Sequence, residues 1–211
     1  MKLYHIQSTR SSRPLWLLEE MNLAYELVYV TREMLLDPEY KTLHPHGKVP
    51  LLVDDQIMIY ESAAICAYLA DKYPEKNMAP APQSHGRAYY YQWLFYASLT
   101  LEPPVEQFMF HVIPNLPEKL LPKSDQTRVP KAEALEWFKQ VSRPLNELLS
   151  NQEFLVENQF SAADVVTGGV LFWALQLGMM EEESPTKNYI TKLAARPAFQ
   201  MAESKRYYKK S

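Results

Sequence analysis

Short apolar runs and longer helical patterns alternate in the first part of the chain. The short runs are rich in branched and aromatic residues, which favours strands, and they cover residues 1–6, 24–30, 49–54 and 57–61. Apolar residues recur at helical spacing in 11–22 and 62–73, and a short helix is expected within 31–43. The order predicts a strand–helix–strand unit followed by a hairpin and a helix.

Beyond about residue 86 the pattern is helical and no convincing strand remains. Four segments carry it, residues 87–103, 130–149, 161–180 and 185–207. A proline-rich polar stretch before them is the best linker in the chain. The sequence therefore predicts a small α/β domain over residues 1–76, a linker over 77–86 and an all-helical domain over 87–211.

Composition narrows the class of partner. The chain has 47% hydrophobic and 22% charged residues, a net charge of -3 and a pI near 6.0. This balance gives no basic footprint for nucleic acid, and no run of about eighteen apolar residues suggests a membrane span. The start of the chain lacks the apolar stretch of a signal peptide. We expect a soluble, cytoplasmic protein without nucleic-acid or membrane partners.

Cysteine and histidine usage limits the chemistry further. Cys66 is the single cysteine, so a disulfide framework and a C-x-x-C redox motif are both excluded. We interpret Cys66 as a buried structural thiol in a helix. No cluster of Cys and His has metal-ligand spacing, so no metal cofactor is expected.

The stretch "LHPHGKVPLLVDD" at residues 43–55 sets a proline against the start of a strand. Pro50 cannot donate to a sheet ladder. The N–H and C=O of Val49 could instead pair with a peptide-like ligand, as in recognition by strand addition. A cis Val49–Pro50 bond would aim these groups outward, although cis bonds are a small minority of X-Pro bonds.

A second candidate feature lies eleven residues later, at a strand-to-helix junction. A helix N-terminus suits a ligand carboxylate because its N–H groups are unpaired, and Glu61 could pair with an ammonium beside Ser62. One α-amino acid head would satisfy both. The alternative is that Ser62 is only an N-cap and Glu61 a favourable first-turn charge.

Four motifs together resemble one family. "HPHGKVPLL", "YESAAICAYLADKYP", "FSAADV" and "ARPAFQMA" occur in the order and at the spacings of bacterial-type members of the cytosolic glutathione transferase superfamily. The resemblance implies a thioredoxin-like first domain and a cis Pro50. It also implies that Val49 pairs with the cysteinyl backbone of glutathione, that Glu61 and Ser62 hold its γ-glutamyl head, and that Lys48 reaches its glycyl carboxylate.

The resemblance places the thiol chemistry between the first strand and the first helix. Relatives set a Tyr, Ser or Cys there against the glutathione sulfur, and "IQSTRSSRPLW" fits the serine/threonine type best. Thr9 matches the family's hydroxyl in most alignments and Ser8 in others, so Thr9 is the favoured candidate. A backbone N–H or Arg10 is the remaining alternative, and the other serines are also interpretable as caps or turn formers.

The second half adds one structural motif and one candidate pocket. Ser161 and Asp164 have the spacing of a helix capping box. Tyr96, Phe108 and His111 are candidates for the wall of a pocket for an electrophile, although aromatic residues at helical spacing are more often core.

The resemblance therefore implies an enzyme, a glutathione transferase that conjugates the glutathione thiolate to hydrophobic electrophiles. It also implies a role in detoxification and a homodimer, with glutathione as co-substrate, and no metal is expected. The alternatives are glutathione-dependent peroxide or disulfide reduction, or a non-catalytic module that uses the glutathione-binding fold.

Overall fold

The computed structural model describes residues 1–112 and 129–205. Contacts within the chain group it into two compact units, Met1–Ser84 with the segment that begins at Leu193, and His85–Lys192. The domain boundaries predicted from the sequence differ from this grouping, because they assign the last helix to the second domain. The end of the expected helical domain, residues 206–211, lies outside the described part.

The first unit is built on a mixed four-stranded sheet. Its strands are β1 (Lys2–His5), β2 (Glu26–Tyr29), β3 (Leu51–Asp54) and β4 (Ile57–Tyr60). The order is β2-β1-β3-β4, with β1 parallel to β2 and the other pairs antiparallel. The parallel pair requires a crossover, which the first helix supplies, whereas β3 and β4 need only a tight turn. This arrangement confirms the predicted thioredoxin-like domain.

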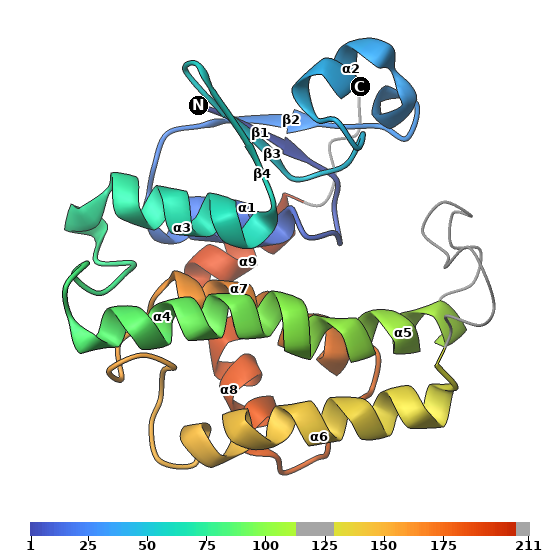
Figure 1. Ribbon diagram of the computed structural model, residues 1–211, viewed down its shortest axis with the longest axis vertical. Coiled ribbons are helices and arrows are strands. Elements are labelled where there is room, and N and C mark those ends of the chain that lie inside the picture. Colours follow the sequence, from blue (N-terminus) through green and yellow to red (C-terminus); the bar gives the residue numbers. More distant parts are fainter. Residues whose placement is uncertain (113–128, 206–211) are drawn as a thin grey trace. The chain divides into compact units, whose positions relative to one another are not determined.

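Helices cover the sheet and support its loops. They are α1 (Ser12–Glu20), α2 (Pro38–Leu43), α3 (Ser62–Lys72) and α9 (Pro197–Ser204), with short 3-10 turns at Met34–Leu36 and Pro74–Lys76. Figure 1 shows α1 and α3 along the same face of the sheet. On α9, Phe199 packs its ring edge-on against Trp16 of α1, with centroids 4.9 Å apart.

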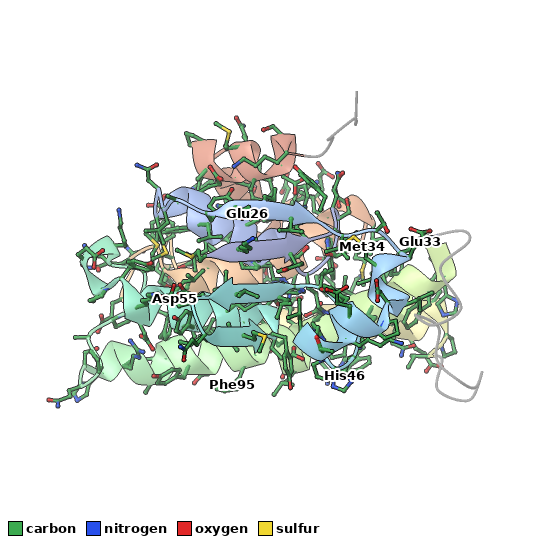
Figure 2. The ribbon with its side chains drawn as sticks, turned by 90° about the horizontal axis from the view of Figure 1, so that it is seen from above. Glu26, Glu33, Met34, His46, Asp55 and Phe95 are labelled. Atoms are coloured by element: carbon green, nitrogen blue, oxygen red, sulfur yellow. The ribbon has the colours of Figure 1, made fainter. Side chains whose placement is uncertain are left out.

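The strand register brings three loops to one end of the sheet. Leu51 is paired with Tyr4 on one side and with Tyr60 on the other. The residues after β1, before β3 and after β4 therefore all leave the sheet at the same end. Figure 2 shows this end marked by His46, opposite the β3–β4 turn at Asp55. The elements thus gather the candidate residues of the first unit in one place.

The second unit is helical, as the sequence predicts. It contains α4 (His85–Tyr96), a π-helical turn (Ala97–Leu101), α5 (Glu102–Val112), α6 (Lys131–Leu149), α7 (Ala162–Gln176) and most of α8 (Pro185–Ala194). The helix expected over 87–103 instead continues through the π turn into α5. Pro103 and Pro104 are the second and third residues of α5 and directly follow the π turn, where i→i+5 hydrogen bonds replace the α-helical pattern.

The helix expected over 185–207 is two helices in the structure. The break lies at Arg196, whose backbone is extended (φ -65°, ψ 135°). A residue that precedes proline is disfavoured in helical conformation, and Pro197 then begins α9.

No helix within residues 1–112 and 129–205 has the length and apolar character needed to span a membrane.

Candidate functional site

The loop between β1 and α1 holds a connected set of hydroxyl groups. The Thr9 Oγ1 lies 2.6 Å from the Ile6 carbonyl oxygen and 2.8 Å from the Ser11 Oγ. Ser11 occupies the N-cap position of α1 but makes no side-chain cap bond. Its Oγ turns back to β1, where it lies 2.8 Å from His5 Nδ1 and 2.9 Å from the Ile6 carbonyl oxygen. Ser11 is therefore the N-cap of α1 by position, but its hydroxyl bonds to the end of β1 and not to the helix.

The two hydroxyls named from the sequence differ in their surroundings. Ser8 is exposed, and its backbone lies in the left-handed region (φ 57°). Thr9 is partly buried, and its Oγ1 has three hydrogen-bond contacts, with the Ile6 carbonyl oxygen, the Ser11 Oγ and the Ser11 backbone N–H. Both stand at the end of the sheet where Val49 and Glu61 also lie.

The segment that enters β3 has the expected shape. The Val49–Pro50 peptide is cis, as the resemblance implies. No other described residue hydrogen-bonds the backbone of Val49. One residue earlier, the Lys48 carbonyl oxygen accepts a 2.7 Å hydrogen bond from the Tyr40 hydroxyl. Tyr40 is buried beside Tyr4, which raises the pKa of its hydroxyl to about 12 and keeps it a neutral donor. Tyr40 therefore fixes the main chain that leads into Val49.

The junction of β4 and α3 brings a carboxylate and a helix N-terminus together. Glu61 is the N-cap of α3, is exposed, and has φ 71°, a region that non-glycine residues seldom adopt and that is enriched at ligand sites. Ser62 is the first helical residue and is buried. The interpretation of Ser62 as an N-cap is therefore wrong.

A buried arginine orients Ser62. The Arg13 Nη1 donates to the Ser62 Oγ at 3.3 Å. Because the guanidinium takes up a lone pair of that oxygen, the hydroxyl proton of Ser62 is left to point elsewhere. No side chain caps the start of α3, so its first N–H groups and the Ser62 hydroxyl form a set of donors suited to an anion.

Two histidines border the same end of the sheet. The buried His44 packs its ring against Tyr60 with centroids 4.9 Å apart, and its Nδ1 accepts from the backbone N–H of His46. Burial, together with the nearby His46, lowers the pKa of His44, so its ring is neutral at pH 7. Within the described ranges no three His, Cys, Asp or Glu side chains are grouped so that they could hold a metal ion.

Cys66 is a structural residue, as the sequence predicts. It is fully buried in α3, and burial raises the pKa of its thiol to about 12. A protonated thiol without access to solvent is a poor nucleophile. Any sulfur chemistry at this site must therefore come from a thiol that the ligand brings.

The three residues expected to line an electrophile pocket all lie in the second unit. The Tyr96 hydroxyl donates to the Val141 carbonyl oxygen at 2.6 Å, which ties α4 to α6. Phe108 is buried, and the exposed His111 places Nε2 at 2.8 Å from the Val129 carbonyl oxygen. These contacts give Tyr96 and Phe108 a packing role within the unit, and the pocket stays a prediction.

Reasoning from the sequence missed His5, Tyr40 and the role of Arg13. His5 alternates with Tyr4 in a strand pattern, so the sequence could have predicted that its side chain is buried. The sequence could not have predicted its hydrogen-bond partner, Ser11. Tyr40 reads as one aromatic residue in a short helix. The contact of Arg13 spans 49 residues, and nothing local in the sequence signals it.

A family model and known proteins match this chain closely. The model described as "Glutathione S-transferase, N-terminal domain" matches residues 3–77. Glutathione S-transferase 3 of Schizosaccharomyces pombe is 31% identical over 216 residues, an alignment that covers 96% of this chain and 86% of that protein.

Solved structures agree with this match. The glutathione S-transferase of a sphingomonad, determined in complex with glutathione, superposes with a TM-score of 0.80 at 26% identity and covers 98% of both chains. The ternary complex of BphK, a bacterial glutathione transferase, has a TM-score of 0.81 at 26% identity, with 98% of this chain and 99% of that chain covered.

Proposed function

This chain belongs to the cytosolic glutathione S-transferase superfamily and is a glutathione transferase; from that premise we propose that it transfers the thiolate of glutathione to hydrophobic electrophiles. The observation that carries the proposal is the register of Tyr4, Leu51 and Tyr60. It gathers a hydroxyl-bearing loop, a strand-entry backbone and a helix N-terminus at one end of the sheet. Such a set matches the thiol, peptide and α-amino acid parts of glutathione.

Each part of the ligand has a partner in the proposed complex. The Val49 N–H and C=O pair with the cysteinyl backbone of glutathione in the manner of an added strand. Ser62 and the first N–H groups of α3 hold the γ-glutamyl carboxylate, and the exposed Glu61 pairs with the ammonium. The exposed Lys48 reaches the glycyl carboxylate. The hydrogen bond from the Tyr40 hydroxyl to the Lys48 carbonyl oxygen supports this pose, because it holds the main chain next to Val49 in place before the ligand binds.

A single hydroxyl suffices for the thiol chemistry we propose. A free thiol has a pKa of about 8.5, and lowering it to about 6.5 takes about 2.7 kcal/mol. A hydrogen bond to a charged acceptor contributes about 1.5–3 kcal/mol. A helix N-terminus adds about 0.3–1 kcal/mol, and α1 begins three residues after Thr9. We assign Thr9 as this donor, with Ser8 as the alternative.

The finer features rest on the family. We propose that the electrophile binds against the second unit near Tyr96, Phe108 and His111, that the protein is a cytoplasmic homodimer with a role in detoxification, and that no metal takes part. Light scattering across a dilution series tests the dimer, and a constant mass near that of one 24.6 kDa chain would contradict it.

Glutathione binding is the first test. Glutathione should stabilise the native protein by about 2.7 kcal/mol at a hundredfold excess over its dissociation constant, measured as a rise in melting temperature. Glu61→Ala and Ser62→Ala should remove most of this shift, whereas Glu75→Ala, an exposed acid in the same unit, should keep it. A wild-type protein that shows no shift at millimolar glutathione would overturn the proposal.

The reaction is tested by three assays side by side. Conjugation to an activated aryl halide should be the main activity, ahead of peroxide reduction and reduction of a small disulfide. A protein that binds glutathione but turns over none of these substrates would instead be a binding module.

A further inference from the structure

A buried histidine lies behind the loop that carries Thr9. His5 and Ser11 are 2% and 0% exposed. The His5 Nδ1, the Ser11 Oγ and the Thr9 Oγ1 form a series in which each neighbouring pair is 2.8 Å apart. The series runs from the buried end of β1 to the partly exposed threonine. The transfer chemistry proposed above uses only the last member, so the first two need an explanation.

The number of protons in the series decides what Thr9 can do. A hydroxyl has one proton to donate and two lone pairs. The Ser11 Oγ already accepts from the Ile6 backbone N–H at 3.2 Å. The Ile6 carbonyl oxygen needs a donor, and it lies 2.9 Å from the Ser11 Oγ and 2.6 Å from the Thr9 Oγ1.

One tautomer of His5 leaves Thr9 without a proton to spare. If Nδ1 is unprotonated, the Ser11 proton is donated to it. The Thr9 proton is then the one left for both the Ile6 carbonyl oxygen and the second lone pair of the Ser11 Oγ. Donation to a ligand sulfur would leave the Ile6 carbonyl oxygen without a donor in a partly buried position, which costs free energy.

The other tautomer releases Thr9. If Nδ1 carries the proton, it donates into the second lone pair of the Ser11 Oγ. The Ser11 proton is then shared between the Ile6 carbonyl oxygen, at 2.9 Å, and the Thr9 Oγ1, at 2.8 Å, and the Thr9 proton is available to a sulfur anion. Burial lowers the pKa of His5 to about 4, so at pH 7 the ring is neutral and bears one such proton.

We propose that His5 is a positioning residue, whose Nδ1–H donates to Ser11 and thereby frees the hydroxyl proton of Thr9 for the glutathione sulfur. This inference rests on the proposed function and on Thr9 as the donor. His5 itself touches neither the ligand nor the reacting atoms. It adds one proton to the series.

The test compares variants that keep or remove this proton. His5→Asn places an amide N–H near the position of Nδ1, and His5→Leu removes the donor at similar bulk. Thr9→Val removes the last member, and Thr167→Val is the matched control, because Thr167 is a buried threonine of the second unit. The readout is the pKa of bound glutathione, from the ultraviolet absorbance of its thiolate, beside the affinity for S-methylglutathione, which cannot ionise.

His5→Leu and Thr9→Val should each raise the pKa of the bound thiol by about one unit or more, which lowers the thiolate fraction about tenfold below the wild-type pKa. The double variant should shift it no further than Thr9→Val alone, since both changes remove one effect. His5→Asn and Thr167→Val should leave it near the wild-type value. Affinity for S-methylglutathione should stay unchanged in every variant.

Three results would overturn parts of this account distinguishably. If the wild type does not bind S-methylglutathione, the proposed function fails. If Thr9→Val raises the thiol pKa and His5→Leu does not, only the role of His5 fails. If Thr9→Val has no effect, the assignment of Thr9 fails and the role of His5 with it.

A spectroscopic measurement covers the case in which His5→Leu does not fold. Nitrogen NMR of the wild type at pH 7, with the His5 signals assigned by their loss in His5→Asn, should show a neutral ring protonated at Nδ1. A ring protonated at Nε2 alone would overturn the inference. Ser11→Ala interrupts the series with His5 in place and should raise the thiol pKa as His5→Leu does.

Discussion

Replacement of Asp164 by alanine should be among the most destabilising single changes in the second unit. Asp164 is fully buried in the first turn of α7, where it forms a capping box with the N-cap residue Ser161. Its carboxylate accepts from the backbone N–H groups of Leu155 (3.0 Å) and Ser161 (2.8 Å). It also accepts from the Ser161 hydroxyl (3.0 Å) and the Tyr189 hydroxyl (2.7 Å).

The magnitude follows from the donors that lose their acceptor. A buried donor left unsatisfied costs about 1–3 kcal/mol. The two backbone N–H groups cannot turn away, whereas the hydroxyls of Ser161 and Tyr189 can rotate toward other acceptors. Asp164→Ala should therefore lower the free energy of unfolding by about 3–5 kcal/mol. Tyr189→Phe should cost only about 1 kcal/mol, because three donors still satisfy the carboxylate.

Urea denaturation measures both effects. The midpoint should fall at an unchanged m-value, which reports a change of stability alone. Glu136→Ala, an exposed acid of α6, is the matched control and should stay within about 0.5 kcal/mol of the wild type. A loss below about 1 kcal/mol for Asp164→Ala would refute the reasoning.

Two further predictions concern the first unit. Tyr40→Phe removes the hydrogen bond to the Lys48 carbonyl oxygen, worth about 1 kcal/mol, and should weaken glutathione binding by up to about fivefold in calorimetric titration; an unchanged affinity would contradict a role in holding the loop. The pKa of His5 is about 4 in the folded protein against 6.5 for the free side chain, so the unfolded chain binds more protons between these values and stability should fall by about 3 kcal/mol as the pH drops from 6.5 to 4. Urea midpoints at pH 7 and 4.5 should therefore differ less in His5→Asn than in the wild type, and equal differences would count against the buried neutral ring.

Local patterns account for the parts of the fold that could be predicted. Branched and aromatic runs marked all four strands, and helical spacing marked α3, α6 and α7. Pro197 ended one expected helix early because of its effect on the preceding residue, a rule that was available from the sequence. The continuation through Pro103 and Pro104 was less readable, since it depends on the π turn that precedes them.

Contacts distant in sequence explain what could not be predicted at the site. "GKVP" and "ES" marked Val49, Pro50, Glu61 and Ser62 as a group because they flank one hairpin. The link from Arg13 to Ser62 depends on how α1 and α3 pack. The turn of Ser11 back to His5 depends on the loop conformation. A pattern of single residues carries neither kind of information.

The pH-rate profile of glutathione conjugation to an activated aryl halide tests the central claim most directly. The wild type should show saturable turnover that rises with pH through a thiol pKa about one to two units below the free value of about 8.5. In Thr9→Val the profile should move up by about one to two units, with recovery at alkaline pH, while Ser8→Ala should follow the wild type. A wild-type rate no higher than the uncatalysed reaction at every pH would contradict the assignment of this chain as a working glutathione transferase.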